Sequence, residues 1–186
     1  MVKVRNMLIA QRKTKPKTKG FTMTEAMVVV ALIAVLAAIA LPIFSASLER
    51  QRLRNAVELL VSDMRLARTR AESQGARGSS VVELTVDSGD SSVWSYTVTN
   101  DLNGTLLSRS SSDLTGEIAM QVSDFGDSDG DGKTDIVFTS VRGLDSDADG
   151  EISLMIGSTS AVVSRNLLGL ISVCSNSSLG YASCGS

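Results

Sequence analysis

Two short stretches of the sequence hold enough carboxylates to bind a metal ion, "DSDGDGKTD" at residues 127–135 and "DSDADGE" at residues 145–151. Both contain D-x-D-x-D-G, the first half of an EF-hand loop. In this pattern, oxygens at positions 1, 3 and 5 point inward and the glycine makes the sharp turn. The expected Ca²⁺ ligands are Asp127, Asp129, Asp131, the Lys133 carbonyl and Asp135 in the first loop, and Asp145, Asp147 and Asp149 in the second.

Neither loop is a complete EF-hand, because Phe138 and Ile156 stand where the bidentate glutamate of position 12 belongs. Aspartate and glycine are also good turn formers, so acidic turns without metal are the alternative. Calcium is favoured because three carboxylates within five residues repel one another unless a cation lies between them. We expect two weak sites, with dissociation constants of about 10⁻⁴–10⁻³ M, at opposite ends of a strand over residues 136–141.

Enzyme chemistry is not supported by the sequence. The chain has no histidine, which excludes Ser-His-Asp and Cys-His catalysis and His-ligated zinc. No glycine-rich phosphate loop is present, and the serine-rich stretch at residues 108–113 reads as a loop. We therefore expect a protein that is not an enzyme.

A charge asymmetry marks the N-terminus as a targeting segment. The first 19 residues carry seven of the 18 Lys and Arg residues and no acid, which leaves 11 basic against 20 acidic residues. From Ala26 to Leu41 every residue is apolar, and the 23 residues between Glu25 and Glu49 carry no charge. This length suffices for a transmembrane helix, which needs about 20 residues. The basic flank should stay cytoplasmic and the remainder should lie outside.

The two cysteines, Cys174 and Cys184, lie close together near the C-terminus. In a reducing cytosol they would be inert thiols, whereas in an exported protein they would form one small disulfide loop. Because the N-terminal segment favours export, we expect the bond.

An amphipathic helix should continue beyond the apolar run. Apolar residues recur every three to five positions, at Leu48, Leu53, Val57, Leu60, Met64, Ala67 and Ala71. The arginines between them could suggest nucleic-acid binding, but acidic neighbours favour a solvated face. These acids are Glu49, Glu58, Asp63 and Glu72. Pro42 should kink the helix rather than end it, and the glycines of residues 73–80 should end it.

Short runs rich in Val, Ile and Thr follow, separated by Gly, Ser, Asp and Asn, which is typical of antiparallel strands and turns. They lie at residues 81–86, 93–98, 117–122, 136–141, 151–156 and 167–174. The predicted fold class is therefore α+β: a long N-terminal α-helix, transmembrane and then amphipathic, followed by an antiparallel β-sheet domain.

The stretch "KGFTMTE" at residues 19–25, followed by the apolar helix, resembles the class III signal of type IV pilins and type II secretion pseudopilins. In that family a prepilin peptidase cuts after the glycine, and the new N-terminal residue is N-methylated. The resemblance implies cleavage between Gly20 and Phe21, N-methylation of Phe21, and assembly roles for Glu25 and Pro42, which lie at the family's spacings. Met23 stands where leucine is commoner. An ordinary secretory signal peptide is the alternative, but its apolar region is shorter and precedes the cleavage site.

The family also suggests why Glu25 adjoins a membrane segment. A carboxylate there is costly unless it is paired. The resemblance implies that Glu25 neutralises the N-terminal amine of a neighbouring subunit in the filament and so sets the register between subunits. A snorkelling interfacial charge is the alternative reading.

A looser resemblance connects the chain to the H-type minor pseudopilins, which include a minor type IV pilin linked to fimbrial assembly and DNA uptake. It depends on "ARTRA" at residues 67–71 and "FTSVRG" at residues 138–143. It implies a structural subunit at or near the tip of a type IV pilus or type II secretion pseudopilus, where it primes assembly. Another minor pilin class is the alternative.

A DNA-binding minor pilin for natural transformation is the competing function. The DNA-binding H-type members carry Gly-Arg-x-Arg in the last strands, where this chain reads "GLIS" at residues 169–172. Phosphate contacts need Lys or Arg, and from Asp87 onward only Arg109, Lys133, Arg142 and Arg165 are basic. Nucleic acid is therefore a disfavoured partner.

The resemblance also implies the segments, location and partners of the chain. The expected segments are a leader at 1–20 that is removed, a transmembrane part at 21–44, an amphipathic part at 45–75, and a periplasmic or extracellular β domain at 76–186. The protein should cross the bacterial inner membrane once and then enter the pilus or pseudopilus. Expected partners are other major and minor pilins or pseudopilins, the prepilin peptidase, the inner-membrane assembly platform and membrane lipid.

Overall fold

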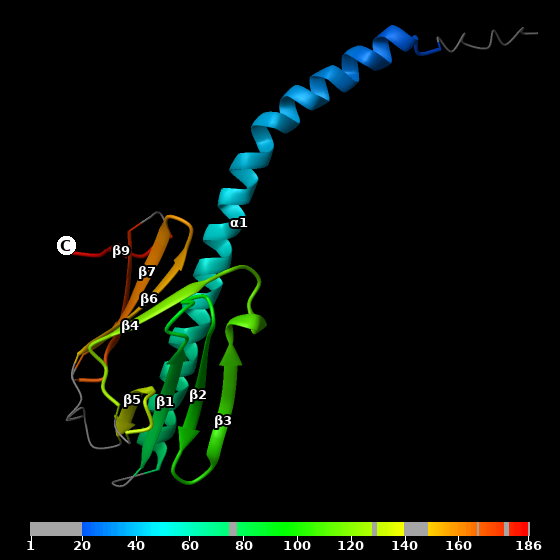
Figure 1. Ribbon diagram of the computed structural model, residues 1–186. Helices are drawn as coiled ribbons and strands as arrows, with labels where there is room; N and C mark the ends of the chain where they lie inside the picture. Colours follow the sequence, from blue (N-terminus) through cyan, green and yellow to red (C-terminus); the bar gives the residue numbers. More distant parts are fainter. Residues whose placement is uncertain are drawn as a thin grey trace, which may run out of the picture. The chain divides into compact units, whose positions relative to one another are not determined.

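The computed structural model describes residues 20–74, 78–127, 130–139, 149–166, 168–176 and 179–185. The chain divides into two compact units, Met1–Pro42 and Ile43–Ser186. The predicted α+β class is confirmed, since a long N-terminal helix is followed by two β-sheets (Figure 1).

The helix α1 spans Met23–Ser73, 51 residues. It begins after Thr22, whose Oγ1 accepts a hydrogen bond from the Glu25 amide at 3.3 Å. The order Thr22-x-x-Glu25 has the spacing of a capping box, which satisfies amide groups that have no partner in the first turn. The helix continues through Pro42 as predicted, although proline removes the amide that would bond to the Ala38 carbonyl. The division between the two units falls directly after Pro42.

The unit Ile43–Ser186 contains two β-sheets. The first has the order β3-β2-β1-β5 and the second the order β4-β6-β7-β8-β9. The strands are β1 Ser79–Val86, β2 Trp94–Asn100, β3 Gly104–Ser110, β4 Ala119–Ser123, β5 Thr134–Thr139, β6 Gly150–Ile156, β7 Thr159–Arg165, β8 Ile171–Ser175 and β9 Ala182–Ser183. A short 3₁₀ helix, Ser111–Asp113, follows β3.

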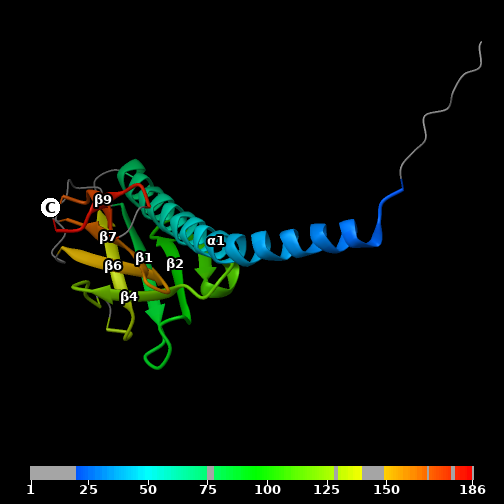
Figure 2. The same ribbon diagram turned by 90° about the horizontal axis from the view of Figure 1, so that it is seen from above.

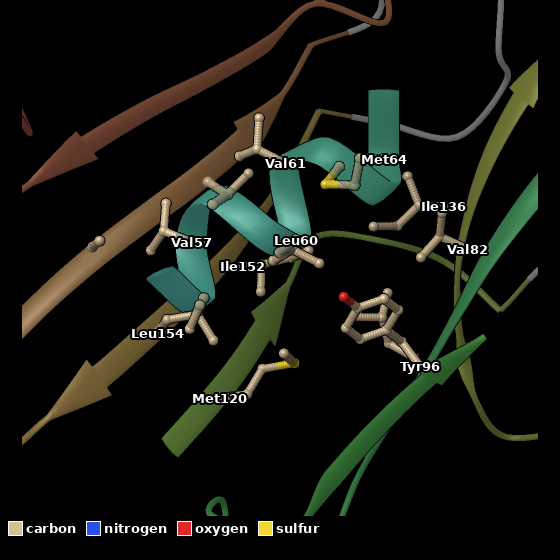
Figure 3. Close-up of a cluster of buried hydrophobic side chains, with 14 of the residues drawn as sticks. Val57, Leu60, Val61, Met64, Val82, Tyr96, Met120, Ile136, Ile152 and Leu154 are labelled. Atoms are coloured by element: carbon tan, nitrogen blue, oxygen red, sulfur yellow. The ribbon is translucent and has the colours of Figure 1, made fainter. Parts of the chain in front are cut away.

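One hydrophobic core joins the second part of α1 to both sheets. The predicted apolar face is confirmed: Leu53, Val57, Leu60, Met64, Ala67 and Ala71 are buried. Figure 3 shows Val57, Leu60 and Met64 of the helix together with residues from several strands, among them Val82 and Ile136 of the first sheet and Met120, Ile152 and Leu154 of the second. Viewed from above, this part of α1 runs along one side of the strands (Figure 2).

Several expectations need correction. Sequence reasoning missed β3 and β7, and it read residues 108–113 as a loop although residues 108–110 belong to β3. The sheets are not wholly antiparallel, because β8 and β9 pair in parallel. The other predicted strands are present with shifted ends. Residues 140, 141 and 167, which two of the predicted strands included, lie outside the described residues.

Asp63 was expected on the solvated face of the helix, and this was wrong, because only 6% of it is exposed. Its Oδ2 accepts hydrogen bonds from the Tyr96 hydroxyl at 2.8 Å and from Arg109 Nε at 3.2 Å. Burial, together with the Asp63 carboxylate, raises the pKa of Tyr96, so the phenol stays protonated and can donate. One carboxylate therefore fastens α1 to β2 and β3.

We expect Asp63→Ala to lower the free energy of unfolding by about 1–3 kcal/mol, because it leaves the buried Tyr96 hydroxyl without its acceptor. Arg109 is more than a third exposed, so water replaces most of its lost partner. The measurement is urea unfolding of the unit Ile43–Ser186. Glu58→Ala, which removes the exposed Arg54–Glu58 pair, is the control and should cost less than about 0.5 kcal/mol. Equal losses for the two variants would contradict this role of Asp63.

Candidate functional site

The proposed cleavage bond, Gly20–Phe21, lies outside the helix in a stretch without regular secondary structure, and both residues are exposed. Phe21 exposes 72% of its surface. A Cβ atom placed on Gly20 would meet no atom within 4 Å. The described part of the chain therefore does not require glycine at this position.

Glu25 lies in the first turn of α1. A carboxylate at this end of a helix is favoured by the helix dipole, and the Thr22 cap completes the turn. Thr22 is a functional residue that sequence reasoning missed, although T-x-x-E before an apolar run was a readable signal. The described part of the unit Met1–Pro42 provides no cation for Glu25, because residues 20–42 contain no Lys or Arg.

Among the described residues, no protein neighbours cover the apolar residues that follow Glu25. The most apolar 18-residue window of α1 has a mean hydropathy of 3.0, and none of it is buried. Length and composition therefore suit it to cross a membrane. Pro42 lies near the end of this stretch, and the structure does not describe its side chain.

The predicted disulfide is confirmed: Cys174 and Cys184 are bonded, with their Cα atoms 5.0 Å apart. Cys174 lies in β8, and Cys184 follows β9. The bond closes a loop that places Leu179 in the core, 4% exposed. It therefore fixes the C-terminal segment against the rest of the unit.

In the first acidic loop, the Asp127 carboxylate folds over the turn. Its Oδ1 accepts hydrogen bonds from the amides of Gly130 at 2.6 Å and Asp131 at 3.2 Å, and its Oδ2 from the Gly132 amide at 2.8 Å. Gly130 and Gly132 have φ values of +80° and +84°, which residues with a side chain rarely adopt. This turn therefore requires both glycines.

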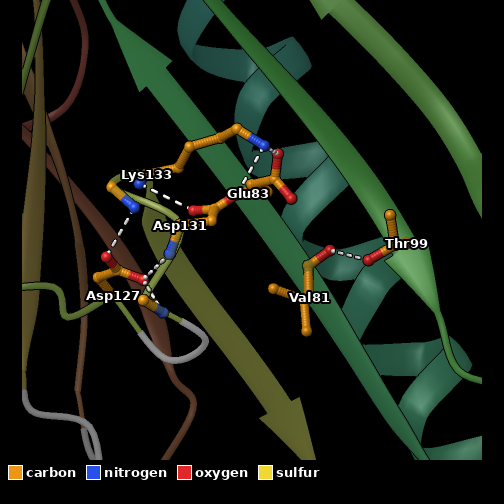
Figure 4. A network of polar contacts seen from close by, with 8 residues as sticks. Val81, Glu83, Thr99, Asp127, Asp131 and Lys133 are labelled. Atoms are coloured by element: carbon orange, nitrogen blue, oxygen red, sulfur yellow. Dashed lines mark hydrogen bonds and ion pairs between the residues drawn. The ribbon is translucent and has the colours of Figure 1, made fainter.

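Lys133 supplies a positive charge beside the same turn. Its Nζ lies 2.7 Å from Asp131 Oδ2 and also pairs with Glu83 of β1 (Figure 4). Asp131 and Glu83 raise the pKa of Lys133. Sequence reasoning took the backbone carbonyl of Lys133 as the ligand and did not foresee its side-chain contacts. Lys133 thus relieves part of the carboxylate repulsion that suggested a metal ion.

The remaining predicted ligands are spread over different environments. Asp135 lies within β5, opposite Glu83, and is buried at 4% exposure. Asp149 directly precedes β6. Asp129, Asp145 and Asp147 lie outside the described residues. Within the described ranges no three acidic or cysteine side chains form a group that could hold a metal ion, and the calcium sites stay a prediction.

Calcium binding predicts a measurable heat and a higher melting temperature for the unit Ile43–Ser186 in millimolar Ca²⁺ than in EDTA, because a ligand of the native state stabilises it. Asp131→Asn should weaken both effects. Asp90→Asn, a change in a different acidic turn between β1 and β2, is the control and should not. Calorimetry that detects no heat, with an unchanged melting temperature, would show that these loops are only acidic turns.

Gly20→Ala should leave the chain itself undisturbed and yet slow or block its processing, because alanine restricts the backbone that a tight protease site must accept. The expected result in cells is a precursor heavier by the 20-residue leader, detected by immunoblot. Thr24→Ser, four residues away, is the control and should be processed normally. Normal processing of Gly20→Ala would contradict the assignment of this bond.

Comparison with known families gives one match. Residues 15–41 match the "Prokaryotic N-terminal methylation motif". These residues include the Gly20–Phe21 bond, Glu25 and most of the exposed apolar stretch. No curated protein and no solved structure matches the chain. The methylation motif implies processing by a prepilin peptidase and assembly with other pilins. Together with the long N-terminal helix and the two largely antiparallel sheets, it makes the chain a type IV pilin-like or pseudopilin-like protein.

Proposed function

We propose that the protein is a minor pilin or minor pseudopilin, a structural subunit at or near the tip of its filament that primes or supports assembly. The observation that carries this proposal is Glu25, a lone carboxylate at the head of an apolar helix segment of which none is buried by the described residues. Such a segment is stable in a membrane or against other apolar helices. After cleavage at Gly20, the N-terminal amine of a neighbouring subunit would supply the missing cation.

The minor class is favoured by contacts at the end of the helix, where the sequence resembles H-type pseudopilins. Ala67 and Ala71, the first and last residues of "ARTRA", are fully buried. Arg68 between them donates to the Gly169 carbonyl at 2.9 Å and pairs with Glu72. The residues of this motif therefore have structural roles. The two alanines allow close packing of the helix in the core, and the arginine holds the loop between β7 and β8.

The same proposal gives the topology and the partners. The basic leader stays in the cytoplasm, the apolar part of α1 crosses the inner membrane, and the unit of β-sheets lies in the periplasm. The partners are other major and minor pilins or pseudopilins and the assembly platform. The segment boundaries expected from the sequence, near residues 20, 44 and 75, are part of this proposal.

DNA binding is disfavoured by the surroundings of the basic residues. Phosphate contacts need accessible Lys or Arg side chains. Among the described residues from Gly78 onward, Arg109 pairs with Asp63, Lys133 pairs with Glu83 and Asp131, and Arg165 is only 2% exposed. Leu170, at the place of the first motif arginine, is exposed but uncharged.

Glu25→Ala should still insert into the membrane, because the change removes a charge from an apolar segment, but its share in sheared filaments should fall at least about tenfold if pairing is worth more than about 1.4 kcal/mol. Glu25→Gln separates two explanations, because it keeps the shape and polarity of the first turn and removes the charge. We expect it to fail like the alanine variant.

Glu49→Ala is the matched control, an exposed glutamate further along the same helix, and should assemble normally. The measurement is quantitative immunoblotting of sheared filaments against the membrane fraction. If Glu25→Gln enters filaments at the level of the unchanged protein, Glu25 serves as a helix cap and the pairing account is wrong.

A further inference from the structure

The first basic residues after the apolar stretch form a basic belt on α1, defined here as Arg50, Arg52 and Arg54. All three are exposed, and Arg54 pairs with Glu58 at 2.8 Å. Arg50 and Arg52 form no ion pair with the described residues. The unit Ile43–Ser186 thus presents two cations without an ion pair among the described residues, close along the helix to the exposed apolar residues Ile43 and Phe44.

The distance along the helix matches the polar layer of a bilayer. Arg50 lies six residues beyond Phe44, about 9 Å at 1.5 Å per residue. A bilayer of about 40–45 Å with a hydrocarbon core of about 30 Å has a polar layer of about 5–7 Å on each side. Helix side chains generally lean toward the helix N-terminus, so the general lean of the Arg50 and Arg52 side chains is toward the apolar stretch. With Phe44 at the edge of the hydrocarbon, they reach the level of the lipid phosphates.

The placement of charge favours the same partner. The six residues from Glu49 to Arg54 hold three arginines and one acid, whereas the chain beyond its first 19 residues holds 11 basic against 20 acidic residues. The belt is therefore basic within an acidic protein, and it adjoins the apolar stretch. An acidic domain is repelled by an anionic membrane surface, and arginines at that surface offset the repulsion.

The chemistry of arginine fits phosphate in particular. Guanidinium groups bind phosphate oxygens through two parallel hydrogen bonds. Arg50 and Arg52 lie about 200° apart around the helix, at 100° per residue, so they face different lipids on two sides of it. The side chain of Arg52 passes the turn at Gly116, where an added Cβ would lie 3.3 Å from its Cδ and 3.5 Å from its Nη1.

We propose that Arg50 and Arg52 bind the phosphates of anionic phospholipids in the leaflet next to the β-sheets and hold the subunit at a fixed depth before it enters a filament. This inference depends on the proposed function for the membrane location of α1. It goes further in naming a second lipid contact, opposite the leader, that remains after the leader is removed.

The test is native mass spectrometry of the full chain, purified in detergent without filaments and titrated with phosphatidylglycerol or phosphatidylcholine. The unchanged protein should retain phosphatidylglycerol in preference to phosphatidylcholine. Arg50→Gln with Arg52→Gln should lower the retained phosphatidylglycerol at least about fivefold, and Arg50→Lys with Arg52→Lys should restore part of it. Sodium chloride at 0.5 M should lower the retention, and 10 mM inorganic phosphate should not displace the lipid.

Arg65→Gln with Arg70→Gln is the matched control, two exposed arginines of the same helix at least about 30 Å beyond Phe44. This variant should retain lipid as the unchanged protein does. The proposal is overturned if the Arg50/Arg52 glutamine variant keeps its phosphatidylglycerol, or if both pairs of changes lower it equally. It is also overturned if that variant keeps the lipid but no longer enters filaments, because the arginines would then contact other subunits.

Lipid retention is measured on unassembled protein, so its outcome is independent of the filament assay. The lipid proposal can fail while the Glu25 test succeeds, and the Glu25 test can fail while the lipid proposal succeeds. Circular dichroism melting of each variant shows whether its fold is intact. If the glutamine variant is unfolded, the lysine variant and the salt series still decide, because salt-insensitive retention contradicts a phosphate contact.

Discussion

A single carboxylate at the head of an uncovered apolar helix constrains the rest of this protein. Glu25 lies in the first turn of α1, and the next charge along the chain is Glu49. An isolated charge deep in a membrane costs on the order of 2.5–3.5 kcal/mol or more. Residues 20–42, the described part of this unit, contain no Lys or Arg to offset that cost, and we propose that the partner is the N-terminal amine of a neighbouring subunit. We propose that this segment makes all of its interactions only when it packs against other subunits, as a subunit of a filament does.

The unit Ile43–Ser186, in contrast, has a hydrophobic core of its own. Its core takes one face of α1 and both sheets, as the meeting of Leu60, Met64, Ile136 and Ile152 illustrates. Asp63 fastens the helix to the first sheet, and the Cys174–Cys184 bond fastens the C-terminal segment. One continuous helix therefore serves two environments, and its composition changes from wholly apolar to amphipathic where the environment changes.

The sequence predicted those features that depend on local pattern. The period of Leu53, Val57 and Leu60 was enough for the buried helix face, and the two nearby cysteines were enough for the disulfide. Sequence reasoning failed for residues whose environment is set by partners that are distant in the sequence. Asp63 looked like its exposed neighbours, because nothing near it reveals that Tyr96 and Arg109 will reach it from β2 and β3.

The missed strands have similar causes. β3 is an edge strand with little burial, so its side chains need not alternate strongly. In β7 the buried positions include Ala161, Val163 and Arg165, and the buried arginine hides the alternation. The first acidic loop is a similar case. Its aspartates suggested calcium ligands, and nothing in the local sequence indicates that Lys133 and Glu83 meet beside them.

We propose that the counter-charge of Glu25 is the new N-terminal amine of a neighbouring subunit. Such an amine exists only if the chain is cut. The most direct test is the intact mass of the protein isolated from cell envelopes, with fragmentation of its N-terminus. The account predicts a chain that begins at Phe21 and carries one N-methyl group. A chain that still begins at Met1, or that begins inside the apolar stretch beyond Glu25, would contradict it.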